Sequence, residues 1–212
     1  MRDDVRAAYV PWVAELEGDP APVRAAAAFL ADAAPDLEPV LVAPSRFMAS
    51  QDAVSEFASG ARVVVTPKNL DSVRDSHGSP VLVYKPTLKE LVIAMRHRGA
   101  QPIAVVEAND ISWAAWAAEI AALNLLDNTV LTPPTRTAAQ QGLFDAIDHV
   151  GNNGWADDPS RRDLRRMLKD LSDLGPINKD ELVAYQLVHP KHRARSFDAL
   201  VRLGVEIGRV SG

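Results

Sequence analysis

Residues 80–87 read Pro80-Val81-Leu82-Val83-Tyr84-Lys85-Pro86-Thr87, an apolar and β-branched run that passes directly into polar residues. Residues 39–43, 62–66 and 102–107 form three more runs of the same kind. Short apolar runs separated by helical patterns are typical of parallel strands that are buried on both faces. We therefore predict an α/β protein with a small, mainly parallel, Rossmann-like three-layer sheet of four or five strands.

Helical patterns lie between and around these runs. Before the first run, residues 2–18 and 23–33 show helical spacing of apolar residues, and Pro11 interrupts the first of these patterns. We expect both segments to be N-terminal helices that pack on the core. The later predictions are helices over 47–58, 69–75, 88–98, 111–126 and 136–150 and a weaker fifth strand over 129–132.

Turn-forming residues divide the chain into three predicted segments. Residues 151–154, Gly-Asn-Asn-Gly, are a clear turn signal, and every pattern beyond them is helical. The predicted segments are an N-terminal helical segment over 1–36, an α/β core over 37–154 and a C-terminal helical subdomain over 155–212.

Composition excludes several classes of site. The 212 residues are 47% hydrophobic and 24% charged, which are ordinary values for a protein with a sizeable core. The absence of cysteine rules out disulfides, thiolate metal sites and a cysteine nucleophile. The sequence shows no signal peptide and no apolar run of the roughly 20 residues that cross a membrane. We expect a soluble, cytoplasmic protein without a membrane partner.

Charge is distributed unevenly along the chain. Residues 1–154 carry 12 Lys and Arg against 19 Asp and Glu, whereas residues 155–212 carry 11 against 9. The acidic body disfavours general nucleic-acid binding. Residues 189–195, however, would place positive charge at the start of the third C-terminal helix, as in a helix-turn-helix unit. One alternative is therefore a nucleic-acid-associated protein that uses this three-helix unit.

Polar residues follow each predicted strand. The carboxyl ends of parallel strands share one edge, where α/β proteins place ligands and where helix N-termini favour anions. Several of these polar residues are also good helix caps, and capping alone would explain them. The residues expected to bind a ligand at this edge are Ser45, Arg46, Thr66, Lys68, Asn69, Thr87 and Asn109.

Three more residues at this edge are candidates for catalysis. Lys85 would supply positive charge, and Glu107 or Asp110 would act with it as an acid–base pair or bind a sugar hydroxyl. The sequence has no histidine cluster with metal-ligand spacing, so we predict no metal site, and we assign no cofactor. Whether the protein is an enzyme stays open at this point.

The motifs of the common phosphate-binding loops are absent. No G-x-x-x-x-G-K-[ST] loop occurs, and no G-x-G-x-x-G follows a strand. Residues 81–91, 98–99 and 103–106 resemble the strand–helix–strand unit that opens the second lobe of superfamily-two helicases. The arginine motif and partner ATPase lobe of that family are missing, so no residue role is carried over. The leading hypothesis is binding of a small anionic ligand, with a phosphorylated one included, at the carboxyl edge of the sheet.

A further alternative is a structural or partner-binding homodimer without catalysis. Trp113 and Trp116 share one face of the predicted helix 111–126, where they would cover either a partner or a ligand. Large apolar residues at helical spacing are first a packing signal, so we favour core positions for both.

Overall fold

The computed structural model describes residues 6–69, 78–99, 101–189 and 196–211. The chain forms two compact units, Met1–Thr132 and Pro133–Gly212. The first unit is α/β and the second is helical. The predicted boundary at residue 154 lies inside the second unit.

The first unit is built on a seven-stranded sheet. Its strand order is β3-β2-β4-β5-β1-β6-β7, and every described pairing is parallel except that of β6 with β7. The α/β class and the mainly parallel sheet are confirmed, whereas the predicted four or five strands were too few. The strands are β1 (Ala7–Val10), β2 (Val40–Val42), β3 (Val63–Val65), β4 (Val81–Tyr84), β5 (Ile103–Val106), β6 (Leu123–Asn124) and β7 (Thr129–Val130).

The four apolar runs of the sequence form β2, β3, β4 and β5. The central strands β2, β4 and β5 are buried along their whole length, and the edge strand β3 is partly exposed. Strands β4 and β5 pair from Val81 with Ile103 to Tyr84 with Val106. This register places the polar residues after both strands side by side at the carboxyl edge.

The prediction of a helix over residues 2–18 is wrong. Ala7–Val10 form the central strand β1, which pairs with β5 on one side and β6 on the other. All four residues are buried, as expected for a strand that is covered on both faces. Pro11 ends the strand because it has no N–H to donate to a neighbour. The short 3-10 helix η1 (Ala14–Leu16) follows.

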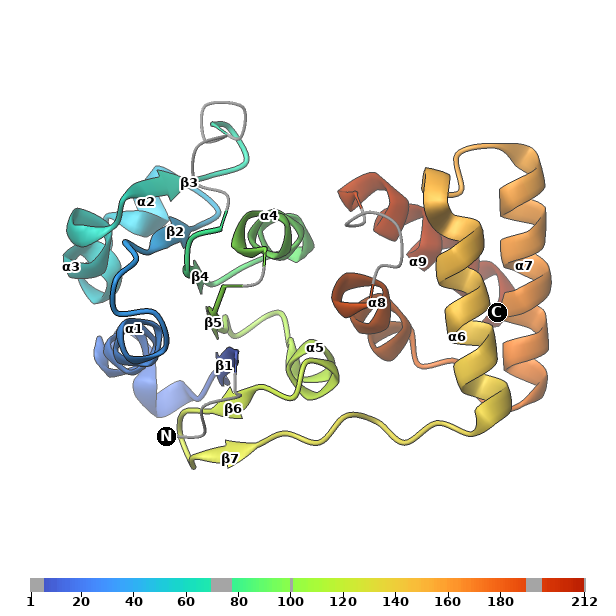
Figure 1. Ribbon diagram of the computed structural model, residues 1–212, viewed down its shortest axis with the longest axis horizontal. Coiled ribbons are helices and arrows are strands. Elements are labelled where there is room, and N and C mark those ends of the chain that lie inside the picture. The colour runs from blue at the N-terminus through green and yellow to red at the C-terminus, as the bar shows by residue number, and fades with distance from the viewer. Residues whose placement is uncertain (1–5, 70–77, 100, 190–195, 212) are drawn as a thin grey trace. The chain divides into compact units, whose positions relative to one another are not determined.

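Helices cover both faces of the sheet (Figure 1). The helices α1 (Ala21–Ala33) and α3 (Asp52–Gly60) lie on one face, whereas α4 (Leu88–Arg98) and α5 (Ala114–Glu119) lie on the other. The short α2 (Arg46–Ala49) precedes α3 and contributes to the same core as α1. Each connection from β1, β2, β4 or β5 to the next parallel strand therefore crosses one face of the sheet.

Some of the helices predicted between the strands are confirmed, and others are wrong or only partly correct. The predictions over 23–33 and 88–98 are confirmed, and the prediction over 47–58 is divided into α2 and α3. The prediction over 111–126 is correct only for α5, from Ala114 to Glu119: Ile111 pairs with Ala108 before the helix, and after it Ala121 adopts a positive φ of 52° and the chain enters β6. The predicted helix over 69–75 falls almost entirely outside the described residues.

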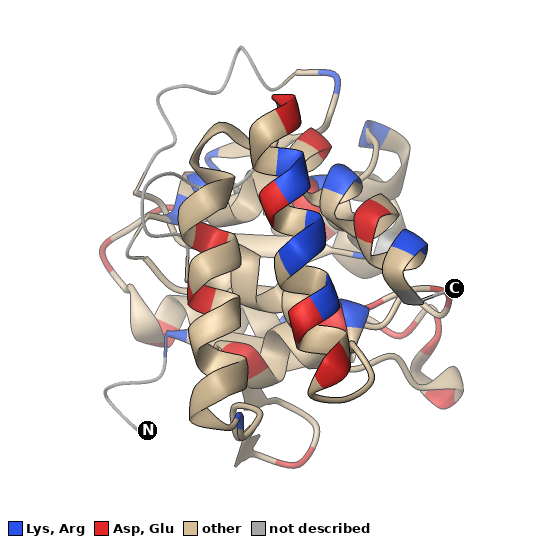
Figure 2. Ribbon diagram, turned by 90° about the vertical axis from the view of Figure 1, so that its right-hand side faces the viewer, with Lys and Arg blue, Asp and Glu red and all other residues tan. Residues whose placement is uncertain are grey.

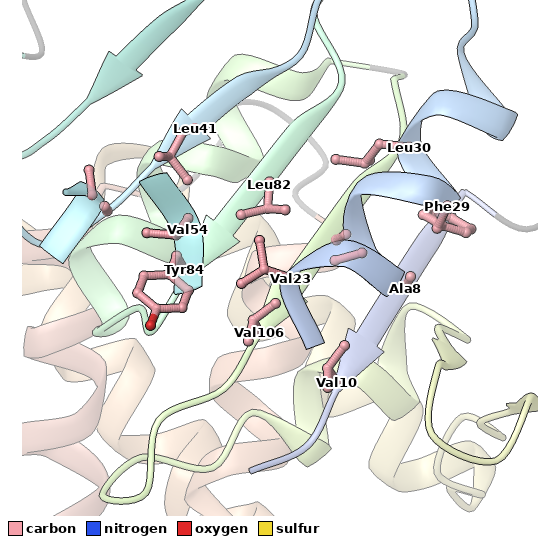
Figure 3. Close-up of a cluster of buried hydrophobic side chains, with 14 residues drawn as sticks. Ala8, Val10, Val23, Phe29, Leu30, Leu41, Val54, Leu82, Tyr84 and Val106 are labelled. Atoms are coloured by element: carbon pink, nitrogen blue, oxygen red, sulfur yellow. The ribbon is translucent and has the colours of Figure 1, made fainter. Parts of the chain in front are cut away.

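The core on the α1 side of the sheet is formed by alternate strand residues and by one helix stripe (Figure 3). Leu41 and Leu82 face this layer from β2 and β4, and Leu30 of α1 packs into it. All three are at most 1% exposed. The alternation follows from the strand period of two, and it fixes which side chains point to α1.

The second unit consists of helices that pack on one another. Helix α6 packs on α7 and α8, and both of these contact α9. Its fully buried apolar residues include Leu164, Leu168, Leu182 and Leu200. The helices are α6 (Ala138–Val150), η4 (Gly151–Asn153), α7 (Asp158–Asp173), α8 (Lys179–Val188) and α9 (Phe197–Ser211). None of the helices within the described residues is long and apolar enough to cross a membrane.

A buried carboxylate links α7 to α9 in the second unit. Glu206 accepts two hydrogen bonds from the Arg165 guanidinium, at 2.6 and 3.0 Å, and one from Arg209 at 2.7 Å. The Glu206 side chain is 5% exposed, whereas that of Arg165 is 49% exposed. The hydrogen bonds from Arg165 are the main cause that lowers the pKa of Glu206 below its ordinary value.

We expect Glu206→Gln to destabilise the second unit in a pH-dependent way. A carboxylate whose pKa is lower in the folded state stabilises the protein above its unfolded pKa and loses this effect as the pH falls. The loss should be about 1–3 kcal/mol at pH 7, the usual range for hydrogen bonds to charged groups. Urea unfolding at pH 7 and pH 3 measures it, and the difference from wild type should shrink at pH 3.

The matched control is Asp170→Asn, which removes the same charge from an exposed position on α7. It should change the free energy of unfolding by less than about 0.5 kcal/mol at either pH. An equal effect of both substitutions would contradict the role given to Glu206.

Candidate functional site

The connections of β1 and β5 leave the sheet toward opposite faces. These strands are neighbours, but the chain continues from β1 to α1 on one face and from β5 to α5 on the other (Figure 1). Such a reversal opens a crevice at the carboxyl ends of the two strands, and ligands of open α/β sheets bind there. The same edge is where the sequence predicted a site.

A pocket of about 30 Å³ lies in this crevice. It is lined by the end of β1 and the following segment, by Tyr84 and Lys85 at the end of β4, and by Val106 and Glu107 at the end of β5. Its volume holds one compact group, such as a water molecule or the head group of a larger ligand. Lys85 and Glu107 are therefore brought together, as predicted from their strand ends.

Glu107 is a buried carboxylate with three hydrogen-bond donors. Its Oε1 accepts a hydrogen bond from the Tyr9 hydroxyl at 2.6 Å and another from the Trp113 backbone N–H. Its Oε2 accepts a hydrogen bond from the Trp12 backbone N–H at 2.9 Å. An ionised carboxylate has about four acceptor positions, so three of them are occupied by protein donors. Glu107 thereby joins β5 to β1, to the segment after β1 and to the start of α5.

Tyr9 is the side-chain donor in this arrangement. Burial, and then the hydrogen bond to Glu107, raises the pKa of the Tyr9 hydroxyl far above its ordinary value. The hydroxyl therefore stays protonated and donates to Glu107 throughout the physiological pH range.

The backbone at Lys85 is strained. Its φ is +48°, which is uncommon for a residue with a side chain, and Pro86 further restricts the conformation of the residue before it. The Lys85 backbone N–H donates to Val106 at 2.8 Å, and Trp113 Nε1 donates to the Pro86 carbonyl at 3.0 Å. These bonds from β5 and α5 hold the turn in place. Backbone strain of this kind clusters at functional sites, and it also occurs in this chain at Ala121, Asn128 and Trp155, which do not line the pocket.

Two side-chain donors of the pocket have no acceptor within the described part of the chain. The ammonium of Lys85 makes no ion pair there and lies 5.6 Å from the ring centre of Tyr84. The buried Nε1 of Trp12 has no hydrogen-bond partner. A buried N–H without an acceptor is costly, so an oxygen-bearing ligand group or a water molecule would be stabilised there.

The pocket also has acidic residues at its rim. Glu17 and Asp19 line it and are both exposed. Asp19 accepts a hydrogen bond from the Ala21 N–H at 2.7 Å, at the start of α1. Burial, and then the charge of Glu17, raises the pKa of Tyr84.

Several predicted ligand-binding residues serve local structure. Ser45 accepts a hydrogen bond from the Met48 N–H as the N-cap of α2, and Thr87 caps α4 in a reciprocal arrangement with Glu90. Asn69 accepts hydrogen bonds from the Thr66 N–H and hydroxyl, at 2.6 and 3.1 Å. These residues do not line the pocket.

The remaining predicted residues are exposed at the same edge but are not gathered around the pocket. Arg46 begins α2, and Lys68 lies in the turn after β3. Asn109 and Asp110 form the tip of a turn that is closed by the pairing of Ala108 with Ile111. The catalytic candidates thus divide into Lys85 and Glu107, which share the pocket, and Asp110, which does not line it.

Two residues of the site were missed from the sequence. Tyr9 and Trp12 were placed in the predicted helix over 2–18, so neither was expected at the strand edge. The signal was present, because Ala7-Ala8-Tyr9-Val10 is a short apolar run that ends at a proline.

Comparisons with protein-family models, with curated proteins and with solved structures give no match. Within the described residues, no group of three or more His, Cys, Asp or Glu side chains could hold a metal ion.

We expect Tyr9→Phe to destabilise the protein by about 1–2 kcal/mol, because it leaves a buried carboxylate with one donor fewer. The control is Tyr84→Phe, which removes a longer hydrogen bond of 3.3 Å to Gln51 and should cost less. Urea unfolding of both variants measures the difference. Equal costs would show that Glu107 does not depend on the Tyr9 hydroxyl.

Lys85→Gly should stabilise the protein, because glycine adopts a positive φ without strain. The relief of about 1 kcal/mol is partly offset by the lost contact with Tyr84, so we expect a net gain of about 0.5 kcal/mol. Lys89→Gly within α4 should instead cost about 0.5–1 kcal/mol, the usual price of glycine in a helix. A loss of stability in both variants, measured by urea unfolding, would contradict strain at Lys85.

Proposed function

We propose that the protein binds a small anionic ligand at the carboxyl edge of its sheet, with the anionic group in the pocket between β1, β4 and β5. The observation that carries this proposal is the Lys85 ammonium, which makes no ion pair within the described residues, in a pocket that Trp12 also lines; the buried Nε1 of Trp12 has no acceptor there either. A cation and an N–H together favour a phosphate or carboxylate oxygen. The Rossmann-like arrangement of sheet and helices supports the same location.

The acidic residues of the pocket need not repel such a ligand. Glu107 already accepts three hydrogen bonds, which offset its charge locally. Glu17 is exposed, so its charge is screened by water and salt. Exposed carboxylates are good acceptors for hydroxyl groups, so Glu17 favours a ligand that carries hydroxyls beside its anionic group. A sugar phosphate has both features.

The size of the pocket sets how the ligand is held. About 30 Å³ accommodates a head group but not a whole sugar phosphate. The remainder of the ligand would extend outward past Glu17. Any acid–base step would involve Lys85 and Glu107, since both line the pocket. Catalysis by these residues, or by Asp110, stays a prediction.

The two alternatives, nucleic-acid binding by the C-terminal helices and a homodimer without catalysis, have fewer observations in their favour. The basic segment at 189–195 falls, except for His189, outside the described residues. On α7, basic and acidic residues alternate (Figure 2), and Arg161, Arg166 and Lys169 form ion pairs with aspartates of the same helix. Trp113 and Trp116 are at most 9% exposed, so neither offers an open surface for a second copy.

The test is a thermal-shift titration with ribose 5-phosphate, inorganic phosphate and ribose. A ligand that binds the folded state raises the melting temperature, by about 5 °C or more at a hundredfold excess over its Kd. We expect shifts with ribose 5-phosphate and smaller ones with phosphate, and none with ribose. A shift with ribose alone, or with none of the three, would contradict the proposal.

Two variants locate the binding site. Lys85→Asn removes the charge but tolerates a positive φ, so it should abolish the shift without unfolding the protein. Lys68→Asn makes the same change at an exposed position outside the pocket and should leave the shift intact. Equal shifts in wild type and Lys85→Asn would place the ligand elsewhere.

A further inference from the structure

A second hollow lies at the amino edge of the sheet, at the opposite strand ends from the Lys85 pocket. It is a groove of about 470 Å³. Pro39 and Pro80, which directly precede β2 and β4, form one side of it. The last turns of α1, the segment that follows them and Phe57 of α3 form the rest.

The wall of this groove is mostly apolar. Leu30 is buried at its base, and Phe57 is half-buried where α3 faces α1. Leu37 is 42% exposed, which is a large fraction for a leucine in the wall of a hollow. The volume lies within the range of about 300–1,000 Å³ that is usual for small-molecule sites. An apolar body of the size of a substituted benzene ring would be covered here.

The charged residues that line the groove are both acidic. Asp36 and Glu38 line it, both are exposed, and neither forms an ion pair within the described part of the chain. No Lys, Arg or His is among its described lining residues. Helix α1 ends at the groove with Ala34 as its C-cap and has no basic residue in its last turn. The negative end of the helix dipole therefore adds to the field of the two carboxylates.

We propose that this groove is a binding site for an apolar organic cation. The apolar part of the ligand would contact Leu30, Leu37 and Phe57, and its positively charged group would lie beside Asp36 and Glu38. A neutral ligand would gain only the apolar contacts. An anion of the same shape would be repelled by both carboxylates and by the end of α1. This site is independent of the anion site at the other edge.

The experiment compares three probes with the same ring and different charges, which are 2-phenylethylammonium, 2-phenylethanol and phenylacetate. Titration of ¹⁵N-labelled full-length protein, followed by amide chemical shifts, gives an affinity and a location for each. We expect the ammonium compound to bind most tightly and phenylacetate most weakly, with about a tenfold range, because each exposed ion pair contributes little. The amides of Ala31, Leu37 and Phe57 should shift.

Substitutions test separately how the charge and the shape of the groove contribute to binding. The double variant Asp36→Asn, Glu38→Gln should bring the affinity for 2-phenylethylammonium to that for 2-phenylethanol, while leaving the latter unchanged. The control is Glu15→Gln with Asp110→Asn, which removes the same charge from exposed positions that do not line the groove. Ala31→Trp at the exposed groove wall should weaken all three probes.

Three results would overturn the proposal. One is equal binding of the three probes at the groove, and another is no shift of groove amides at millimolar probe. The third is a concentration-dependent dimer in sedimentation that Leu37→Glu abolishes, because the groove would then be covered by a second copy of the chain. A monomer whose groove amides shift with the ammonium probe, in the expected order of affinities, supports it.

Discussion

The carboxylate of Glu107 is the contact on which the carboxyl edge of the sheet depends. It draws together the Tyr9 hydroxyl from β1, the Trp12 N–H after β1 and the Trp113 N–H at the start of α5. These groups come from two parts of the chain, residues 9–12 and residue 113, that no local pattern connects. Because the carboxylate is buried, losing one donor costs more than at the surface. The Glu107 side chain therefore helps to set the direction in which the chain leaves β1 and the direction in which it leaves β5.

This arrangement also explains how the pocket keeps unused donors. The backbone N–H groups of Trp12 and Trp113 donate to Glu107, so they cannot donate to a ligand. Lys85 is instead held by its backbone, through the hydrogen bond to Val106, in a conformation that costs about 1 kcal/mol or more. Its ammonium is left without a carboxylate partner in the described chain, although Glu107 lines the same pocket. Lys85 thus combines a strained backbone with an ammonium group that has no carboxylate partner among the described residues.

The two edges of the sheet differ in charge as well as in shape. At the carboxyl edge a small pocket is lined by the cation Lys85 and by Trp12, whose buried Nε1 has no acceptor among the described residues, with acidic residues at the rim. At the amino edge a larger, mostly apolar groove has carboxylates and the negative end of α1. The second unit also contains a buried carboxylate, Glu206, but there two arginines supply the donors. Glu107 is thus stabilised by neutral donors, whereas Glu206 is stabilised by cations.

The sequence alone determined the class of the fold, and it predicted a ligand site at the carboxyl edge of the sheet. Four apolar runs became β2, β3, β4 and β5, because a strand buried on both faces must be apolar along its length. The sequence also placed Lys85 and Glu107 after strands that are consecutive in the chain, and the structure shows that these strands are neighbours in the sheet. Helical spacing of apolar residues misled the interpretation of residues 2–18, where only pairing with β5 and β6 shows that Ala7–Val10 is a strand. The tertiary structure decided that Glu107 is held by Tyr9 and Trp12, since hydrogen bonds between residues about a hundred positions apart leave no local pattern.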